Sequence, residues 1–368
     1  MNKKEPFLRI AKRDSLPFWK AWLIRIGAVI LALAVCAVLI YGVTKLNPLA
    51  VYQAMFQGAL GAPRRIWNTV RDTMLLLGIA VAITPAFKMR FWNIGAEGQI
   101  LVGGIATAAV LRYCANLPTG VMFLLMVVVS VAAGLIWGLI PAFFKAHWNT
   151  NETLFTLMMN YVAIQLTAFF GILWESIKGS GSVGTINSAT QAGWIPTNFL
   201  SGIFGEFNYS INAIIILAIT VFMFVYLKYT KQGYEIAVIG ESENTARYAG
   251  INVKKVIMRT MALSGAISGL VGFIIVSGSS HTISVNTAGG RGFTAIVVSW
   301  LAKFNPFAMI LISFLLIFME KGAGQIASQF NLDQSASDVL TGIILFFILG
   351  CEFFINYRLI VRGKGEKR

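Results

Sequence analysis

The chain contains few charged residues for its length, and acidic residues are the scarcer kind. Of its 368 residues 12% are charged, with 30 lysines and arginines against 15 aspartates and glutamates. A soluble domain of ordinary composition carries about a quarter charged residues. Here 57% of the residues are hydrophobic and the mean hydropathy is +0.73. This composition excludes an ordinary soluble domain and predicts an integral membrane protein.

Cysteine and histidine are also scarce. Cys36, Cys114 and Cys351 lie in apolar stretches without paired or metal-ligand spacing, so we interpret them as small core residues. His147 and His281 are far apart in the sequence. We therefore expect neither a disulfide framework nor a metal site, and no convergent set of catalytic groups for a membrane-embedded enzyme.

The basic residues gather at the two ends of the chain. By the positive-inside rule this pattern places both termini in the cytoplasm. Nucleic-acid binding is the rival interpretation, but these runs flank apolar spans and carry no recognition fold, so no nucleic-acid partner is expected. The predicted parts are a basic segment at 1–22, a transmembrane domain at 23–357 and a basic tail at 358–368.

Long apolar runs predict an all-α polytopic membrane protein with about ten crossings, since roughly 20 residues span a bilayer. The runs lie at about 23–44, 70–87, 93–113, 119–145, 152–175, 211–229, 258–279, 292–303, 305–321 and 339–357. Ten crossings return the C-terminus to the side of the N-terminus, in agreement with the basic ends. This parity places the polar loop 176–210 and the rim 280–291 outside, and the loop 230–257 inside.

Two of these runs are interrupted by glycine. Residues 91–100 carry Glu97 and two amides among glycines, and the run 292–303 is too short to span unaided. Irregular backbone at membrane depth is tolerated only where protein or a water cavity surrounds it. We expect broken or re-entrant helices that enter from opposite sides, as in an inverted repeat. Gly103 and Gly104 are assigned to close helix packing, and the residues assigned to gating or structure are Gly95, Gly98, Asn151, Glu152, Gly290 and Gly292.

The segment around Glu97 predicts a polar pathway, because ionisable groups in hydrocarbon are costly and are usually kept for function. Glu97 either accepts hydrogen bonds that hold the broken segment or lines the pathway. Asn93 and Gln99 offer hydrogen-bond donors and acceptors suited to a polar solute. Trp92 and Phe293 either stack on a flat ring of such a solute or act as interface anchors. The candidate pathway residues are Trp92, Asn93, Glu97, Gln99, Asn160, Phe293 and Thr294.

Residues further along the chain carry helix signals on the inner face. Glu152 favours a helix N-terminus by its charge. In the loop 230–257, Ser242 or Asn244 is suited to cap a short helix that Gly250 ends. A compact cytoplasmic helix between spans is well shaped to receive force from a partner.

Four motifs carry a resemblance to a known family. They are Asn93-Ile94-Gly95-Ala96-Glu97-Gly98-Gln99, Asn151-Glu152-Thr153 with Thr156 to Tyr161, Ala246 to Ile251, and Gly292 to Val298 with Asn305-Pro306. In this order, over about residues 70–345, the chain resembles the long permease subunit of bacterial ABC importers for nucleosides. The wider family also serves ribose and branched-chain amino acids. The stretch 299–304 departs from the pattern, which has a small residue pair and Gly there.

The resemblance implies a heterodimer with a second, shorter permease, two cytoplasmic ATPases and an external substrate-binding lipoprotein, in a bacterial plasma membrane. ATP and Mg would bind the ATPase chains, and no cofactor is expected on this chain. Consistent with this, the sequence lacks a Gly-x-x-x-x-Gly-Lys-[Ser/Thr] phosphate loop. The residues that the resemblance assigns to ATPase coupling are Glu243, Asn244, Ala246, Arg247, Tyr248, Ala249 and Gly250.

Two alternatives to nucleoside import remain at this point. The first is the same importer class with ribose or another small polar solute as substrate. The second is a proton-coupled secondary carrier, which would use an acidic residue such as Glu97 and would need no ATPase.

Overall fold

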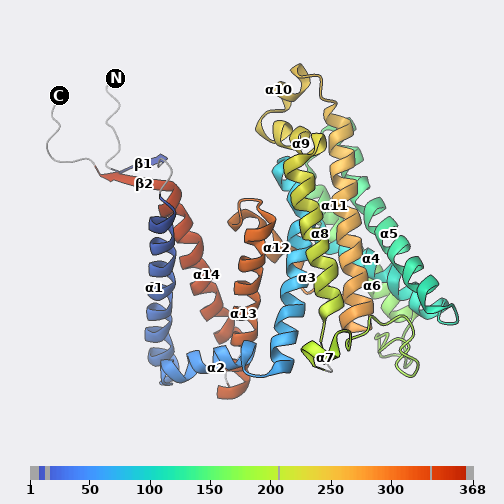
Figure 1. Cartoon of the computed structure of the whole chain (residues 1–368), viewed down its shortest axis with the longest axis horizontal. Coiled ribbons are helices and arrows are strands. Elements are labelled where there is room, and N and C mark those ends of the chain that lie inside the picture. Colours follow the sequence, from blue (N-terminus) through green and yellow to red (C-terminus); the bar gives the residue numbers. More distant parts are fainter. Residues whose placement is uncertain (1–7, 13–16, 206–207, 332–333, 362–368) are drawn as a thin grey trace. The chain divides into compact units, whose positions relative to one another are not determined.

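The computed structural model describes residues 8–12, 17–205, 208–331 and 334–361, which are mostly helical (Figure 1). The remaining parts of the basic ends predicted as cytoplasmic, 1–7, 13–16 and 362–368, lie outside the described residues. The chain forms two compact units, residues 1–65 with 318–368 and residues 66–317.

The first unit contains the two ends of the chain. Its elements are β1 (Leu8–Lys12), α1 (Phe18–Thr44), α2 (Pro48–Leu60), the second part of α13 (Pro306–Phe330), α14 (Gln334–Asn356) and β2 (Tyr357–Val361). The strands pair antiparallel, with Leu8 opposite Val361. The helices enclose a small apolar core of Ala32, Cys36, Ile40, Val51, Ala54, Met319, Ile326 and Ile344. The paired strands correct the expectation of helices alone, because hydropathy gives no signal for a short ribbon between the termini.

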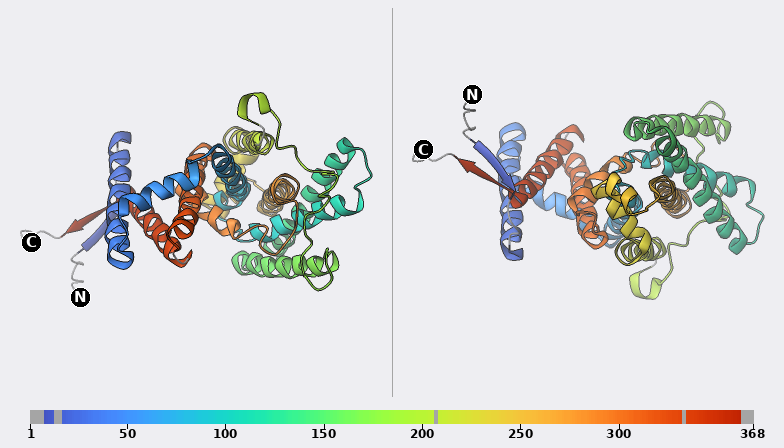
Figure 2. Two further views of the ribbon diagram at one scale, coloured as in Figure 1. Left: turned by 90° about the horizontal axis from the view of Figure 1, so that it is seen from below. Right: turned by 90° about the horizontal axis from the view of Figure 1, so that it is seen from above.

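The second unit is a helical bundle. Its elements are α3 (Pro63–Lys88), α4 (Ala96–Tyr113), α5 (Thr119–Trp148), α6 (Glu152–Leu173), α7 (Ser201–Phe204), α8 (Ser210–Tyr229), α9 (Lys231–Glu241), α10 (Glu243–Tyr248), α11 (Val253–Ile275), the π-helix η1 (Val276–Ser280), α12 (Arg291–Leu301) and the first part of α13. Figure 2 looks along these helices and shows α11 surrounded by others of the unit.

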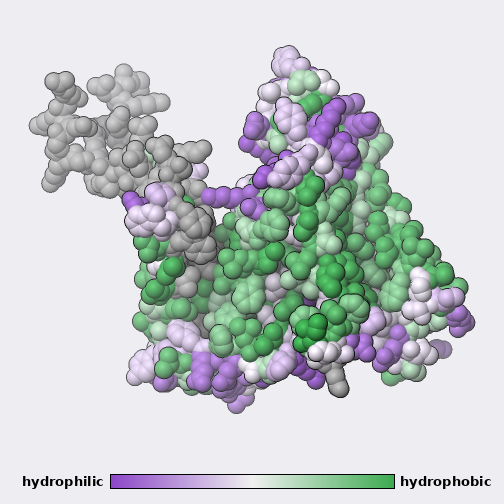
Figure 3. Space-filling model, in the orientation of Figure 1, coloured by the Kyte–Doolittle hydropathy of each residue, from purple (hydrophilic) through white to green (hydrophobic). Residues whose placement is uncertain are grey.

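Six helices in the described part of the chain are long and apolar enough to cross a membrane: α3, α5, α6, α8, α11 with η1, and α13. Hydrophobic side chains cover the middle of these helices, and hydrophilic ones gather over α9 and α10 (Figure 3). The chain is therefore a multi-pass membrane protein. At 11 residues α12 is too short to span alone, as its sequence predicts.

Glycine allows α4, α5 and α11 to pack with their backbones in contact. A Cβ on Gly103 would lie 2.6 Å from the Cα of Gly269, and one on Gly134 would clash with the carbonyl oxygen of Gly265. Such close approach is the usual role of small residues between membrane helices. The packing role predicted for Gly103 is confirmed. Of the cysteines, Cys36 and Cys351 are buried as predicted, whereas Cys114 is partly exposed because α4 ends just before it.

Candidate functional site

The carboxylate of Glu97 joins the N-termini of two interrupted helices. Glu97 lies in the first turn of α4 and is 5% exposed. Its Oε1 accepts a hydrogen bond from the backbone N–H of Gly290 at 2.7 Å, and its Oε2 accepts one from Gly292 at 2.8 Å. Helix N-termini leave backbone N–H groups unpaired and carry a partial positive charge, both of which a carboxylate satisfies. Glu97 thus accepts hydrogen bonds at the interrupted helices, which is one of the two roles expected for it, and its place in a substrate pathway stays a prediction.

Glycine is required where α12 meets Glu97. Gly290 has a φ of +72°, which disfavours residues with a Cβ. A Cβ on Gly292 would lie 2.7 Å from both the backbone nitrogen and Oε2 of Glu97. The two glycines therefore let the start of α12 approach the carboxylate closely, which agrees with the structural role predicted for them.

Asn93 organises the loop that enters α4. Its Oδ1 accepts a hydrogen bond from the backbone N–H of Gly95 at 3.1 Å, and its Nδ2 donates to the hydroxyl of Ser264 on α11 at 3.2 Å. The amide of Gln99 also donates to Asn93 Oδ1, at 3.4 Å. Asn93 and Gln99 are both buried. The Asn93 amide and the NH₂ group of Gln99 thus bind the protein itself.

Helix α6 holds the same loop from the other side. Asn160 accepts a hydrogen bond from the backbone N–H of Gly98 at 2.8 Å and donates to the carbonyl of Ile94 at 2.9 Å. The hydroxyl of Thr156 accepts from the backbone N–H of Ile94 at 3.2 Å. The irregular backbone before α4 is therefore surrounded by hydrogen-bonding protein groups, the condition under which such backbone is tolerated at membrane depth.

Two buried polar atoms near these residues have no hydrogen-bond partner within the described part of the chain, Gln99 Oε1 and Trp137 Nε1. A Cβ on Gly98 would lie 3.1 Å from Trp137 Nε1. Leaving a buried polar group unpaired costs about 1–3 kcal/mol. The region around Gly98 thus contains buried polar atoms that its own hydrogen bonds do not use.

The three other predicted pathway residues lie at the surface of the unit. Trp92 and Phe293 are each 44% exposed, and Thr294 is exposed. The Trp92 ring stacks on Trp300, with centroids 5.6 Å apart and ring planes at 23°. Trp300 belongs to the stretch that departs from the family pattern, and sequence alone did not show that it contacts Trp92.

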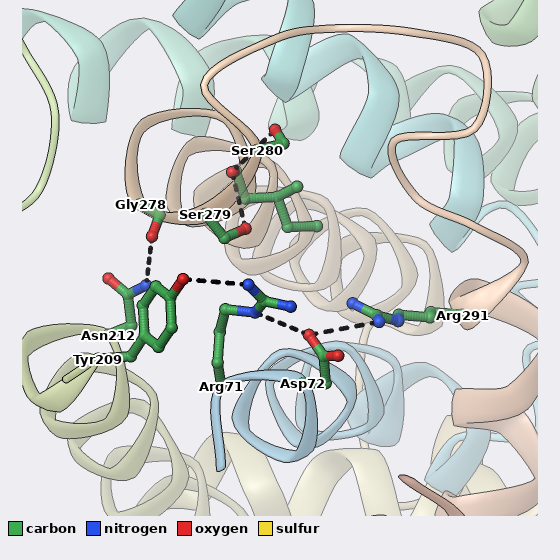
Figure 4. A network of polar contacts seen from close by, with 9 residues as sticks. Arg71, Asp72, Tyr209, Asn212, Gly278, Ser279, Ser280 and Arg291 are labelled. Carbon is green, nitrogen blue, oxygen red and sulfur yellow. Dashed lines mark hydrogen bonds and ion pairs between the residues drawn. The ribbon is translucent and has the colours of Figure 1, made fainter. Parts of the chain in front are cut away.

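A network of charges ties α3 to the start of α12 (Figure 4). Asp72 is buried, and its Oδ1 lies 2.9 Å from Arg71 Nε and 3.4 Å from a guanidinium nitrogen of Arg291. Arg71 also donates to the hydroxyl of Tyr209 at 3.1 Å. The first turn of α12 is thus held by two carboxylates, Glu97 through the backbone and Asp72 through Arg291. The sequence reasoning missed Asp72, although an ionisable residue inside the predicted run 70–87 is a detectable signal.

The same network borders the π-helix η1. Asn212 on α8 donates to the carbonyl of Gly278 at 3.1 Å, and the hydroxyls of Ser279 and Ser280 donate to the carbonyl of Ile275 (Figure 4). Single turns of π-helix are rare and occur frequently at functional sites.

The loop 176–210 packs over the end of η1. The backbone N–H of Ile195 donates to the carbonyl of Ser277 at 2.9 Å, and that of Ile186 donates to the carbonyl of His281 at 2.9 Å. The Trp194 ring stacks on His281 with centroids 3.8 Å apart. This loop and the rim 280–291 therefore lie together, as membrane parity predicts.

The start of α6 is built as its sequence predicts. Asn151 Oδ1 accepts a hydrogen bond from the backbone N–H of Leu154 at 3.1 Å and so caps the helix. Glu152 in the first turn forms an ion pair with Lys145 at 2.9 Å. These contacts give both residues a structural role.

The predicted coupling residues form α10 and the turn that follows it. Ser242 caps α10 by accepting from the backbone N–H of Thr245 at 3.3 Å, and Gly250 has a φ of +76°. Tyr248 is 93% exposed. The other predicted coupling residues are Glu243 and Arg247, which pair at 3.7 Å, the exposed Asn244 and Ala249, and the buried Ala246.

Helix α9, directly before α10, packs against the end of α3. A Cβ on Gly240 would clash with the carbonyl oxygen of Lys88. The loop that begins at Met89 leads into Asn93 and α4. Only a few residues therefore separate the contact of α9 with α3 from the start of α4. A displacement of α9 would be passed to α4 through this short loop.

Comparison of the sequence with known proteins identifies the family of this chain. The sequence model of the family described as "Branched-chain amino acid transport system / permease component" matches residues 65–349. The chain is 30% identical to the guanosine ABC transporter permease protein NupP of Bacillus subtilis, over 94% of this chain and 97% of that protein. It is 26% identical to the glucose ABC transporter permease protein TsgB13 of Haloferax volcanii, over 96% and 93%. It is also 26% identical to the nucleoside ABC transporter permease protein NupB of Lactococcus lactis, over 87% and 91%.

Proposed function

The chain belongs to the branched-chain amino acid transport system permease family and is a permease subunit of an ABC transporter, and we propose that it forms the path by which nucleosides enter the cell. The observation that carries the substrate class is the full-length similarity to permeases named for guanosine and for nucleosides. The proton-coupled carrier is set aside, because the chain is itself an ABC permease and such transport draws on ATP.

The charge at the junction of α4 and α12 supports a neutral substrate. Discontinuous membrane helices often direct positive N-termini toward an anionic group of the substrate. In this chain the carboxylate of Glu97 already occupies the N-terminus of α12 through Gly290 and Gly292, and its charge lies in the first turn of α4. The positive end of α12 is therefore not free to attract the carboxylate of an amino acid. A nucleoside, which is polar but uncharged, fits this arrangement better.

The proposed assembly contains this chain, a second permease, two ATPase domains and an external lipoprotein that captures the substrate. ATP and Mg bind the ATPases. In the proposed topology, ten crossings include α1, α14 and the interrupted α4 and α12, both termini are cytoplasmic and the halves form an inverted repeat in a bacterial plasma membrane. The exposed Tyr248 of α10 supports contact with an ATPase, and the loop 176–210 offers the surface for the lipoprotein.

A sugar is the second candidate substrate, because a relative of nearly equal coverage is named for glucose. The two candidates separate in a competition experiment on cells that express the complete transporter. We expect uptake of radiolabelled guanosine to be suppressed by unlabelled nucleosides and to be unaffected by excess glucose or ribose. Uptake of labelled glucose or ribose with no uptake of any nucleoside would contradict the proposal.

A further inference from the structure

Helix α6 carries polar side chains on two opposite faces. Its buried face holds Thr156 and Asn160, which bind the loop before α4. Its other face is exposed along the whole helix, at positions three or four residues apart. We call this face the α6 stripe, and it consists of Leu154, Met158, Tyr161, Gln165 and Phe169.

The stripe differs from the exposed faces of the neighbouring spans. Exposed side chains within α8 are apolar as far as Val225, and those of α5 are apolar from Val121 to Phe144. Such faces suit lipid. On α6, Gln165 interrupts the apolar pattern at roughly 20 Å from the inner end of the helix and about 12 Å from its outer end, at 1.5 Å per residue.

An exposed amide at this depth is costly in hydrocarbon. An amide without a hydrogen-bond partner is strongly disfavoured in an apolar medium, and polar side chains within membrane spans normally face a bundle interior or a water-filled cavity. Gln165 is too short to reach either membrane surface. The α6 stripe therefore faces a polar environment rather than lipid.

We infer that the α6 stripe lines the translocation path and binds the base of the nucleoside, an inference that rests on the proposed function. Tyr161 and Phe169 lie one turn on either side of Gln165, about 6 Å away along the axis. Aromatic side chains stack on any base, and a Gln amide offers a donor and an acceptor that pair with a base edge. The stripe thus presents both kinds of contact that a base needs.

A groove continues the stripe toward the inner end of α6. It is open to the surface, is lined almost wholly by apolar surface and has a volume of about 480 Å³. It is lined by Thr150, Asn151, Leu154, Phe155, Met158, Met159 and Val162. A solute that leaves Gln165 for the cytoplasm would pass along this groove.

The position of the stripe also links the solute to the interrupted helix. Tyr161 follows Asn160 directly in the sequence, and Asn160 binds the backbone at Ile94 and Gly98. A shift of α6 around a bound base would therefore act on the hydrogen bonds that hold the start of α4.

Thiol labelling of the complete transporter in proteoliposomes tests the inference. In a background where Cys36, Cys114 and Cys351 are replaced by Ala, we compare Gln165→Cys with Val221→Cys, which lies on the exposed apolar face of α8. A hydrophilic methanethiosulfonate reagent should label Gln165→Cys, and saturating guanosine should slow that labelling at least fivefold. Val221→Cys should stay unlabelled.

Failure to label Gln165→Cys, or labelling that guanosine does not slow, would overturn the inference. In particular, absence of labelling would show that the stripe is packed against a helix of the second permease or against lipid. If the parent protein imports guanosine in either case, the proposed function stands and only the α6 site falls. A parent protein that imports no nucleoside would overturn both.

Uptake by side-chain variants gives an independent measurement. Gln165→Leu should lower guanosine uptake at least tenfold, and Gln165→Asn should restore part of it. Phe169→Leu should lower uptake, whereas Phe222→Leu, at a similarly exposed position on α8, should not. Co-purification with the ATPase verifies that each variant is assembled. Equal uptake by Gln165→Leu and the parent protein would contradict the inference.

Discussion

Glu97 Oε2 lies 2.8 Å from the backbone nitrogen of Gly292, a residue 195 positions further along the chain. This hydrogen bond joins the first turns of α4 and α12. The carboxylate satisfies two N–H groups at the start of α12 that this helix cannot pair internally. The junction thus depends on one acidic side chain on α4 and on two glycines at the start of α12.

Replacing Glu97 tests the role of this junction in stability. Glu97→Gln keeps one acceptor oxygen but places an NH₂ group opposite a backbone N–H, so we expect partial activity and reduced stability. Glu97→Ala leaves the buried N–H of Gly292 unpaired, at about 1–3 kcal/mol, and removes the acceptor of the Gly290 N–H. Thermal unfolding of the purified complex should rank parent, Gln and Ala in that order. Glu175→Gln, whose carboxylate lies in an exposed turn after α6, is the control, and an Ala variant as stable as the parent would contradict the account.

Gly240 provides a test of how α9 acts on α3. Gly240→Ala places a Cβ against the carbonyl oxygen of Lys88, so the contact between α9 and the loop before Asn93 must open. We expect transport to fall at least tenfold while the chain remains in the membrane. Gly120→Ala, where no atom lies within 4 Å of the added Cβ, should transport like the parent. Equal transport by the two variants would show that this contact does not matter.

The exposed end of α10 is expected to contact the ATPase. Tyr248 is 93% exposed and has no buried role to lose. Tyr248→Arg or Ala249→Arg should therefore leave the chain inserted and abolish transport. Cysteines introduced at 244–248 should form cross-links to the ATPase, whereas cysteines at 180–200 should not. The reverse pattern would mean that the topology is inverted.

His281 should make the loop 176–210 sensitive to pH. Burial against the loop lowers the pKa of His281, partly offset by its contact with the backbone of Ser277. Because the folded-state pKa is depressed, the neutral form is favoured, and its stabilisation is fully present above the unfolded value of about 6.5. That stabilisation is lost as the pH falls below this value. Proteolysis within 176–210 should accelerate between pH 7.5 and 5.5, and His281→Gln should remove most of this dependence. A variant with the same pH dependence as the parent protein would contradict this role of His281.

The amino-acid sequence predicts the membrane class and the interrupted segments, because hydropathy and glycine are local signals. It also predicts a cap for α10 at Ser242 or Asn244, and Ser242 takes that role because a cap acts within three residues of its own position. It does not predict that Asp72 pairs with Arg291 or that Trp92 stacks on Trp300. These contacts depend on the packing of distant helices, for which the sequence offers no periodic signal.

The burial of Asn93, Gln99 and Asn160 shows a similar limit. Composition indicates that amides at membrane depth are functional, but it does not distinguish binding of a solute from binding of the protein backbone. In this chain Asn93 and Asn160 bind the backbone before and within α4. The sequence does not predict a role for the exposed Gln165, because its position on the outer face of α6 becomes evident only after the helix is placed in the bundle.

The most direct test of the account is uptake of labelled guanosine into proteoliposomes that contain the complete transporter, energised either by ATP on the ATPase side or by an imposed proton gradient. If Glu97 joins α4 to α12 in an ATP-driven importer, uptake requires ATP, the gradient alone gives none, and Glu97→Gln retains part of the ATP-driven activity. Uptake driven by the gradient without ATP, and abolished in Glu97→Gln, would identify Glu97 as a proton carrier and contradict the account.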